Sequence, residues 1–309
     1  MNCRFSSSTR VVIRLVFLQA AVPPSIWQSA QALALRYAPA AVIVIASALA
    51  SCRSIEKTIV PSNTRDWQPD QALAAYADFD GDRATVHNIR DCRYLDDDVY
   101  IVNHYDKTFD LRALRTVDFI VCPFADMPDL AHTMLSFGFE DPYGEQDYVA
   151  VSVEIRKERG EEYAVWKGST RQYELMYVLA NERDVIGVRT NHRGEDVYLY
   201  RSTATPEQAR DLFVDVLRRA NKLSQEPEFY DTLTNNCTTN IVRHINRLRP
   251  GRIAPDYRVL LPGHSDRLAY DLGLIEKQGT FEETKRRAHT NALARQFANR
   301  DDFSQQIRR

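Results

Sequence analysis

Residues 148–156 place apolar and polar side chains on opposite sides of an extended chain. Val149, Val151 and Val153 point to one side, and Ser152 and Glu154 point to the other. This period of two is typical of a β-strand with one buried face. Runs rich in β-branched and aromatic residues predict further strands at residues 85–89, 117–124, 132–139, 173–179, 185–189 and 197–201. We therefore expect a sheet of several strands.

Two helices are predicted after these strands. Thr205, Pro206 and Gln208 have the spacing of a capping box with proline in the first turn, so they predict a helix start. A second helix is predicted from about residues 234–236 to residue 248. Strands followed by helices favour the α+β class, with an antiparallel β-sheet packed against helices.

The chain divides into four expected segments. Residues 1–60 form a leader with hydrophobic signal or anchor segments, and residues 61–82 form a linker. Residues 83–275 form the α+β domain, and residues 276–309 form a polar tail that is helical or disordered. The net charge of −2 gives no reason to expect a nucleic-acid partner.

The leader predicts attachment to a membrane. Residues 49–52 read LASC, which resembles a bacterial lipobox and makes Cys52 a candidate for lipidation. The alternative is a pair of short membrane anchors, although each apolar stretch is shorter than the ~20 residues of a spanning helix. Either interpretation tethers the chain to the inner or outer membrane of a bacterial envelope, with its folded domain in the periplasm.

Cys237 is the strongest candidate for a reactive group. It lies in the predicted first turn of a helix, where unpaired backbone N–H groups and the helix dipole favour a thiolate. Local N–H groups at the same place are suited to stabilise an oxyanion. His132 begins a predicted strand and is the candidate base. The alternative is that Cys237 is a core cysteine and His132 a surface histidine. The sequence does not decide whether Cys92 and Cys122 form a disulfide.

Seven strings of this sequence resemble the bacterial Lnb N-terminal periplasmic domain family. They are PSNTRDWQPD, VHNIRD, AHTMLSFGFED, VAVSVEIRKERGEEY, QYELMYVLANERDVIGVRTN, GEDVYLYR and LTNNCTTNI, and the resemblance runs from about residue 61 to about residue 246. The resemblance implies a membrane-tethered periplasmic protein and assigns it no established activity.

A looser similarity is to the circularly permuted papain-like superfamily, which includes lecithin–retinol acyltransferase-like proteins and cell-wall amidases. It implies Cys237 as nucleophile, His132 as base and Glu154 as the residue that orients the histidine. Ser152 is the second choice for that role, and Asn236 would support the site or its oxyanion. The implied function is acyl transfer or hydrolysis on an amide or ester of a cell-envelope peptide or lipid.

Two other functions stay open. Asp96, Asp97, Asp98, His87 and His104 suggest a metal-dependent hydrolase, but no HxH or HExxH spacing occurs. The other is a non-catalytic envelope module that binds a protein partner. We assign no metal site, since metal-ligand spacing is absent, and we expect no cofactor, since the sequence contains no glycine-rich phosphate loop.

Overall fold

The computed structural model describes residues 60–96, 99–162, 168 and 170–309, which belong to the compact unit Lys57–Arg309. The described chain has the predicted α+β fold, with a mainly antiparallel eight-stranded sheet in the order β1-β2-β9-β8-β7-β6-β10, and with β5 also paired to β2. The strands of this sheet are β1 (Tyr76–Asp80), β2 (Arg83–Arg90), β5 (His104–Asp110), β6 (Leu114–Phe124), β7 (Met127–Glu140), β8 (Gln146–Arg156), β9 (Glu174–Ala180) and β10 (Tyr198–Arg201). A separate hairpin consists of β3 (Arg93–Tyr94) and β4 (Tyr100–Ile101).

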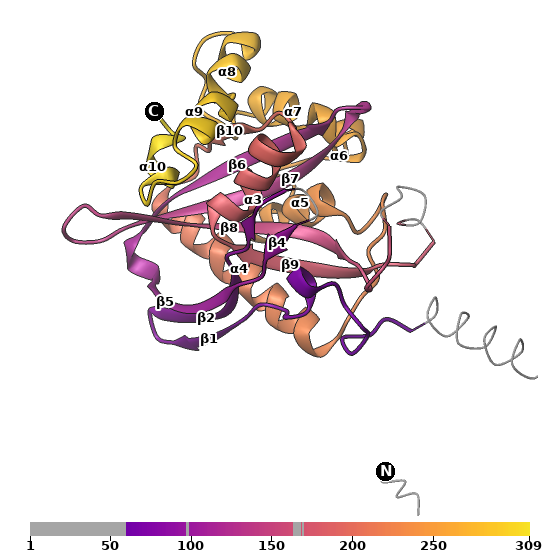
Figure 1. Ribbon diagram of the computed structural model, residues 1–309. Helices are drawn as coiled ribbons and strands as arrows, with labels where there is room; N and C mark the ends of the chain where they lie inside the picture. The colour runs from indigo at the N-terminus through magenta and orange to yellow at the C-terminus, as the bar shows by residue number, and fades with distance from the viewer. Residues whose placement is uncertain (1–59, 97–98, 163–167, 169) are drawn as a thin grey trace, which may run out of the picture. The chain divides into compact units, whose positions relative to one another are not determined.

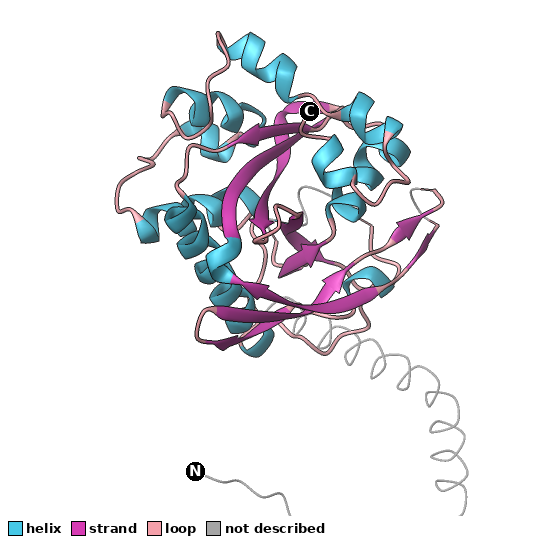
Figure 2. Cartoon of the chain, turned by 90° about the vertical axis from the view of Figure 1, so that its left-hand side faces the viewer, coloured by secondary structure: helices cyan, strands magenta, loops and turns pink. Residues whose placement is uncertain are grey.

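The helices lie on both sides of this sheet (Figure 1, Figure 2). The α-helices are α3 (Glu182–Gly187), α4 (Pro206–Gln225), α5 (Cys237–Leu248), α6 (Tyr257–Leu260), α7 (Ser265–Asp271), α8 (Phe281–Ala288), α9 (Asn291–Gln296) and α10 (Phe303–Gln306). Four short helical segments are η1 (Pro69–Gln71), η2 (Leu111–Ala113), the π-helix η3 (Val188–Arg193) and η4 (Pro262–His264).

The alternation of β8 sorts its side chains between two cores. Val149, Val151 and Val153 join the cluster that packs under α4 and α5. Ala150 joins a second cluster on the opposite face, where α3, α9 and α10 pack. Ser152 and Glu154 share the side of Ala150 because they share its parity.

The predicted helix starts are confirmed. Thr205 caps α4 through a complete capping box with Gln208, and Asn236 caps α5 in the same way. The strand expected at residues 185–189 is wrong, because the segment forms α3 and the start of η3. Asn181 explains this result, since its side chain accepts the backbone N–H of Arg183 and caps α3.

Two segments outside the expected domain contribute to the fold. Residues 61–82 contain η1 and β1, and β1 pairs with β2 over its whole length. Residues 276–309 contain α8, α9 and α10. Near the end of the chain, Nε of Arg308 lies 2.8 Å from Oδ2 of Asp118, and its Nη1 lies 2.8 Å from Oε2 of Glu182.

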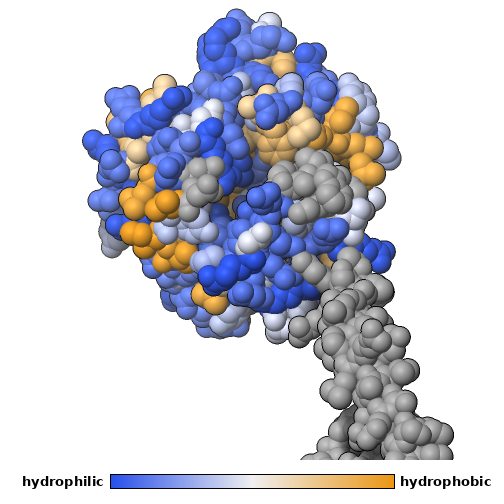
Figure 3. Space-filling view, turned by 45° about the vertical axis from the view of Figure 1, so that its right-hand side comes forward, coloured by the Kyte–Doolittle hydropathy of each residue, from blue (hydrophilic) through white to orange (hydrophobic). Residues whose placement is uncertain are grey.

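The described surface is mostly hydrophilic on the face drawn in Figure 3, where apolar residues gather in small patches. Exposed apolar side chains elsewhere include Tyr143, in the turn between β7 and β8. None of the helices in the described part of the chain combines the length and apolarity needed to cross a bilayer. Residues 1–59 of the leader, with the candidate Cys52, lie outside the described residues.

Candidate functional site

The candidate site lies where two neighbouring strands separate. β7 pairs with β8 from Glu140 and Gln146 as far as Met134 and Ser152. Before Met134, β7 continues to pair with β6 alone. The first turn of α5 contacts β7 at this point, because Oγ1 of Thr238 lies 2.9 Å from Oγ1 of Thr133. The separation therefore leaves an inner edge of β7 beside the start of α5.

Local hydrogen bonds fix the first turn of α5. Oδ1 of Asn236 accepts the backbone N–H of Thr239, and the Thr239 hydroxyl oxygen accepts the backbone N–H of Asn236. Nδ2 of Asn236 donates to the carbonyl oxygen of Thr232. The Asn236 side chain thus supports the site by capping the helix that carries Cys237.

Cys237 is the first residue of α5 and is only 5% exposed. Its sulfur lies 3.9 Å from the carbonyl oxygen of Ala131, which belongs to the peptide that precedes His132. The sulfur also lies 3.8 Å from Oγ1 of Thr238. Among the described residues, the backbone N–H groups of Cys237 and Thr238 have no hydrogen-bond partner. They are therefore available to a ligand oxygen beside the thiol.

The other three predicted side chains form a hydrogen-bonded chain. Nε2 of His132 lies 2.7 Å from Oγ of Ser152, which donates to Oε1 of Glu154 at 2.7 Å. A serine hydroxyl has one proton, so its oxygen accepts from the histidine ring. Nε2 of His132 therefore carries a proton, and Nδ1 has a lone pair. Within the described residues Nδ1 has no hydrogen-bond partner.

The thiol and the imidazole are close in the fold but are not hydrogen-bonded in this structure. The thiol lies against the main chain of β7, one peptide away from His132. Strand alternation directs Thr133 toward α5 and directs the His132 ring toward the side of Ser152. A direct contact between Sγ of Cys237 and Nδ1 of His132 requires rotation of these side chains. His132 itself lies inside β7 and not at the start of a strand.

The charges around this chain favour a neutral histidine beside an ionised carboxylate. Burial, followed by the positive charge of Arg189, lowers the pKa of His132 to about 3. Burial alone would raise the pKa of Glu154, but the charge of Arg90 opposes it, and the net pKa is lowered to about 2. Near neutral pH the imidazole is therefore neutral and keeps its lone pair on Nδ1, but its low pKa makes it a weak base in this conformation.

Sequence reasoning missed the two arginines of this site. Arg90 comes from the end of β2, and its Nη1 lies 3.7 Å from Oε2 of Glu154. Arg189 comes from η3, is 9% exposed and forms an ion pair with Glu195 at 2.6 Å. Both lie in strings that resemble the family, Arg90 in VHNIRD and Arg189 in GVRTN, but no local pattern gives either residue a role, because contacts between distant elements bring both to the site.

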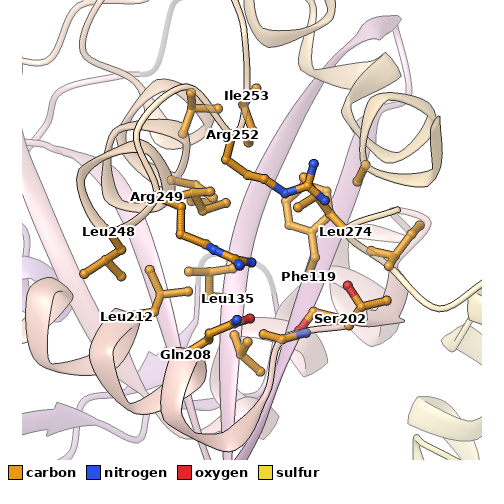
Figure 4. Close-up of a pocket in the computed structure, with 18 of the residues that line it drawn as sticks. Phe119, Leu135, Ser202, Gln208, Leu212, Leu248, Arg249, Arg252, Ile253 and Leu274 are labelled. Atoms are coloured by element: carbon orange, nitrogen blue, oxygen red, sulfur yellow. The ribbon is translucent and has the colours of Figure 1, made fainter. Parts of the chain in front are cut away.

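A cavity of about 380 Å³ lies on the α5 side of the sheet. Most of its lining is apolar, including Leu135, Leu212 and Ile241, and Thr238 joins this lining. Cys237 does not line the cavity itself. Its sulfur contacts the side chain of Thr238, which does line the cavity, so the thiol and the cavity are separated by one residue. Arg249 and Arg252 extend their guanidinium groups over the cavity (Figure 4).

The remaining sequence candidates do not join this hydrogen-bonded chain, although Cys122 lies opposite His132 in the β6–β7 ladder. Cys92 and Cys122 are both buried and free, so they do not form the disulfide that the sequence left open. His87 lies on the surface of β2, where it bonds Asp106 and Asp78. Asp97 and Asp98 lie outside the described residues. Within the described ranges, no group of three or more His, Cys, Asp or Glu side chains is arranged to hold a metal ion.

Comparison with known proteins gives one match. No curated protein and no solved structure matches the chain. The sequence model of the Lnb N-terminal periplasmic domain family matches residues 101–263, which is more than half of the 309 residues. The matched region contains His132, Ser152, Glu154 and Cys237, and a domain of this family is periplasmic. The chain therefore belongs to the Lnb N-terminal periplasmic domain family.

Proposed function

We propose that the domain carries out thiol-dependent acyl transfer or hydrolysis in the bacterial envelope, with Cys237 as nucleophile. The observation that carries this proposal is the hydrogen-bonded chain His132–Ser152–Glu154 beside the helix start that holds Cys237. A base oriented by a carboxylate and a thiol at a helix start are the groups that acyl transfer through a covalent intermediate needs.

The reaction begins with proton transfer from the thiol of Cys237 to Nδ1 of His132. The sulfur attacks the carbonyl carbon, and the new oxyanion accepts the free N–H groups of Cys237 and Thr238. As the tetrahedral intermediate collapses, His132 returns the proton to the leaving amine or alcohol. Water or another nucleophile then gives a proton to His132 and attacks the thioester, and the sulfur leaves and takes this proton back to restore the thiol of Cys237. In the first step, binding of the acyl group must bring the thiol to the imidazole.

The cavity beside Thr238 favours a substrate with an apolar acyl group. Its lining is mainly aliphatic, and it lies next to the residue that follows the thiol. We therefore favour an ester or amide of an envelope lipid or peptide whose acyl part is apolar. The looser similarity to circularly permuted papain-like proteins supports the same order of base, orienting residue and nucleophile along the chain.

A second candidate function is that of a non-catalytic module that binds an apolar ligand. Two observations favour it: Cys237 is 5% exposed, and the cavity is lined without it. In this function Cys237 is a core residue between α5 and the sheet. The chain His132–Ser152–Glu154 then serves only to hold β7 and β8 in place where their pairing ends.

An acyl-trapping experiment separates the two candidates. The folded protein is incubated with p-nitrophenyl octanoate and, in parallel, with p-nitrophenyl acetate, and the acyl adduct is located by peptide mass spectrometry. We expect a burst of p-nitrophenol and a hydroxylamine-sensitive adduct on Cys237, with octanoate faster than acetate. Cys237→Ala should abolish the burst, and His132→Ala should slow it by about 100-fold or more. Cys92→Ser is the matched control and should react like the wild type.

The opposite result identifies the binding module. If octanoate esters leave Cys237 unmodified while a fluorescent fatty acid binds with equal affinity to wild type and Cys237→Ala, the thiol has no part in function. Loss of that binding in Leu212→Arg, which fills the cavity with a charged side chain, would then locate the ligand.

We also propose that residues 1–60 tether the domain to the inner or outer membrane. The LASC string at residues 49–52 supports a lipid on Cys52. Metabolic labelling with an alkyne fatty acid should label the wild type and not Cys52→Ala. Labelling of neither, with the full chain in the membrane fraction, would favour the two apolar segments as the anchor.

A further inference from the structure

Arg90 lies at the junction between β2 and the main part of the sheet. Its register partner is Ala180, the last residue of β9, and its carbonyl oxygen accepts the N–H of Asn181. Its side chain is only 6% exposed. A buried guanidinium needs partners for its charge and its N–H groups, so the groups around it are informative.

Three carboxylates surround this guanidinium. Asp184 of α3 accepts a forked pair of bonds, from Nε at 3.0 Å and from Nη2 at 2.9 Å. Nη1 faces the other two, with Oδ2 of Asp70 at 3.6 Å and Oε2 of Glu154 at 3.7 Å. The fork to Asp184 fixes the plane of the guanidinium, so Nη1 is directed toward Asp70 and Glu154.

The Glu154 carboxylate is thereby held through both of its oxygens. Oε1 accepts the Ser152 hydroxyl, and Oε2 faces Nη1 of Arg90. Rotation of the carboxylate would break both contacts. If Oε1 moved away, the Ser152 hydroxyl would be released to donate to Nε2 of His132. The ring would then carry its proton on Nδ1, the nitrogen that must accept from the thiol.

We propose that Arg90 is a positioning residue of the site, which acts through Glu154 and Ser152 to keep the proton of His132 on Nε2. This inference rests on the proposed function of Cys237. It adds Arg90 to the hydrogen-bonded chain His132–Ser152–Glu154 that supplies the base. Arg90 does not touch the thiol or the substrate in this role. Its contribution is to hold the acceptor of Ser152 in one orientation.

The backbone of β2 explains how Arg90 reaches the site. The register between β2 and β5 shifts between Val86 and Ile89, and Asn88 has a φ of 60°. Asn tolerates this conformation better than most residues. The Asn88 side chain donates to the carbonyl oxygen of Ala74, and its backbone N–H donates to Asp106. This bulge redirects the end of β2 toward β9.

Asp70 provides a matched control. Its carboxylate faces the same Nη1 at nearly the same distance as Glu154, but it bonds Tyr100 and makes no contact with Ser152. Asp70→Asn therefore changes the charge around Arg90 and leaves the chain to His132 intact. Arg90→Gln removes the charge and the fork, whereas Arg90→Lys keeps the charge without the fork.

The test combines a direct readout of the ring with a readout of the thiol. Long-range ¹H–¹⁵N NMR reports which nitrogen of His132 carries the proton, independently of any activity at Cys237. The rate of Cys237 alkylation by iodoacetamide is measured against pH. Besides that of Arg90, the charges that act on the pKa of His132 are those of Arg189, Glu154 and Arg193, and all three residues are unchanged in the Arg90 variants.

We expect the wild type and Asp70→Asn to show the proton on Nε2. Arg90→Gln should show a mixture of tautomers and lose about ten-fold of the His132-dependent alkylation rate. Arg90→Lys should recover part of it. If Arg90→Gln does not fold, the comparison is made between Arg90→Lys and Asp70→Asn. The inference is overturned if the folded Arg90 variant keeps the His132 proton on Nε2 and shows the same pH dependence of Cys237 alkylation as the wild type. Equal alkylation of wild type and His132→Ala overturns the proposed function instead, and the tautomer still decides the role of Arg90.

Discussion

Replacing Arg308 with Ala should destabilise the domain strongly, because this guanidinium neutralises two fully buried carboxylates. Its side chain is 8% exposed, whereas Asp118 and Glu182 are 0% exposed. The guanidinium also lies 3.6 Å from the ring centre of Tyr148. Removing one partner of a buried ion pair typically costs about 3–5 kcal/mol, since the remaining charge stays buried.

The structure places the expected loss at the lower end of that range. Asp118 keeps a second cation, because Nε of Arg201 lies 2.7 Å from its Oδ1. After Arg308 is removed, Glu182 keeps only neutral partners among the described residues, the hydroxyls of Ser136 and Ser304. We therefore expect a loss of about 3 kcal/mol in the free energy of unfolding. For a domain of this size that lowers Tm by about 6–12 °C.

The loss should depend on pH. In the native wild type, burial would raise the pKa of Glu182, but the charge of Arg308 lowers it below its usual value. The ion pair therefore contributes stability above the unfolded pKa of about 4.3, and this contribution is lost as pH falls through the folded pKa. In Arg308→Ala, burial prevails and the carboxyl takes up a proton. The difference between variant and wild type should be largest near pH 7 and shrink toward pH 4.

Urea unfolding at pH 7 and pH 4.5 measures this difference. Arg309→Ala is the matched control, since Arg309 is the same residue type at the neighbouring position and is exposed. In the double variant Arg308→Met with Glu182→Gln, part of the loss should be recovered, because the uncompensated charge is gone. A loss below about 1 kcal/mol at pH 7, or an equal loss at both pH values, would refute the argument from buried charge.

Three further predictions concern other parts of the domain. Burial raises the pKa of Cys92 to about 12, so iodoacetamide at pH 8 should label it only after unfolding, as read by mass spectrometry. The hydrogen bond to Asp106 raises the pKa of His87, so its NMR titration midpoint should lie above the usual value and fall in Asp106→Asn. The resulting stability is present below the unfolded pKa of about 6.5 and is lost as pH rises through the folded pKa. Gly263→Ala should cost about 1–3 kcal/mol in urea unfolding, because the new Cβ would collide with the carbonyl oxygen of Pro128; stability equal to wild type would contradict this.

Local patterns predicted the parts of the fold that local interactions determine. The capping box at Thr205 and the alternation around Ser152 depend on residues a few positions apart, and both are seen in the structure. The strand expected at residues 185–189 was wrong because β-branched composition was given more weight than the cap at Asn181. Val185 and Ile186 of α3 are buried in the core. A helix buries these two side chains as well as a strand would, so burial alone does not distinguish the two structures.

His132 and Cys237 were predicted as candidates from the sequence. Of the contacts in the site, however, only that between Ser152 and Glu154 follows from a shared strand. Ser152 and Glu154 have the same parity on β8, so the sequence brings them together once the strand is recognised. Arg90 reaches Glu154 through a bulge at Asn88, whose positive φ has no clear signature in the sequence. The separation of β7 from β8 likewise depends on packing against α5, which residue patterns do not contain.

The end of the β7–β8 ladder means that a distant turn helps to determine the spacing of the site. The two strands are in register from Glu140 and Gln146, and Asp141 fixes their turn by accepting two backbone N–H groups. The ladder runs six residues further to Ser152, roughly 20 Å away. A slip of this ladder by one residue would move the Ser152 side chain to the opposite face. The hydrogen bond to His132 therefore depends on the register of the whole ladder, which the turn at Asp141 and the buried side chains on both faces of β8 set together.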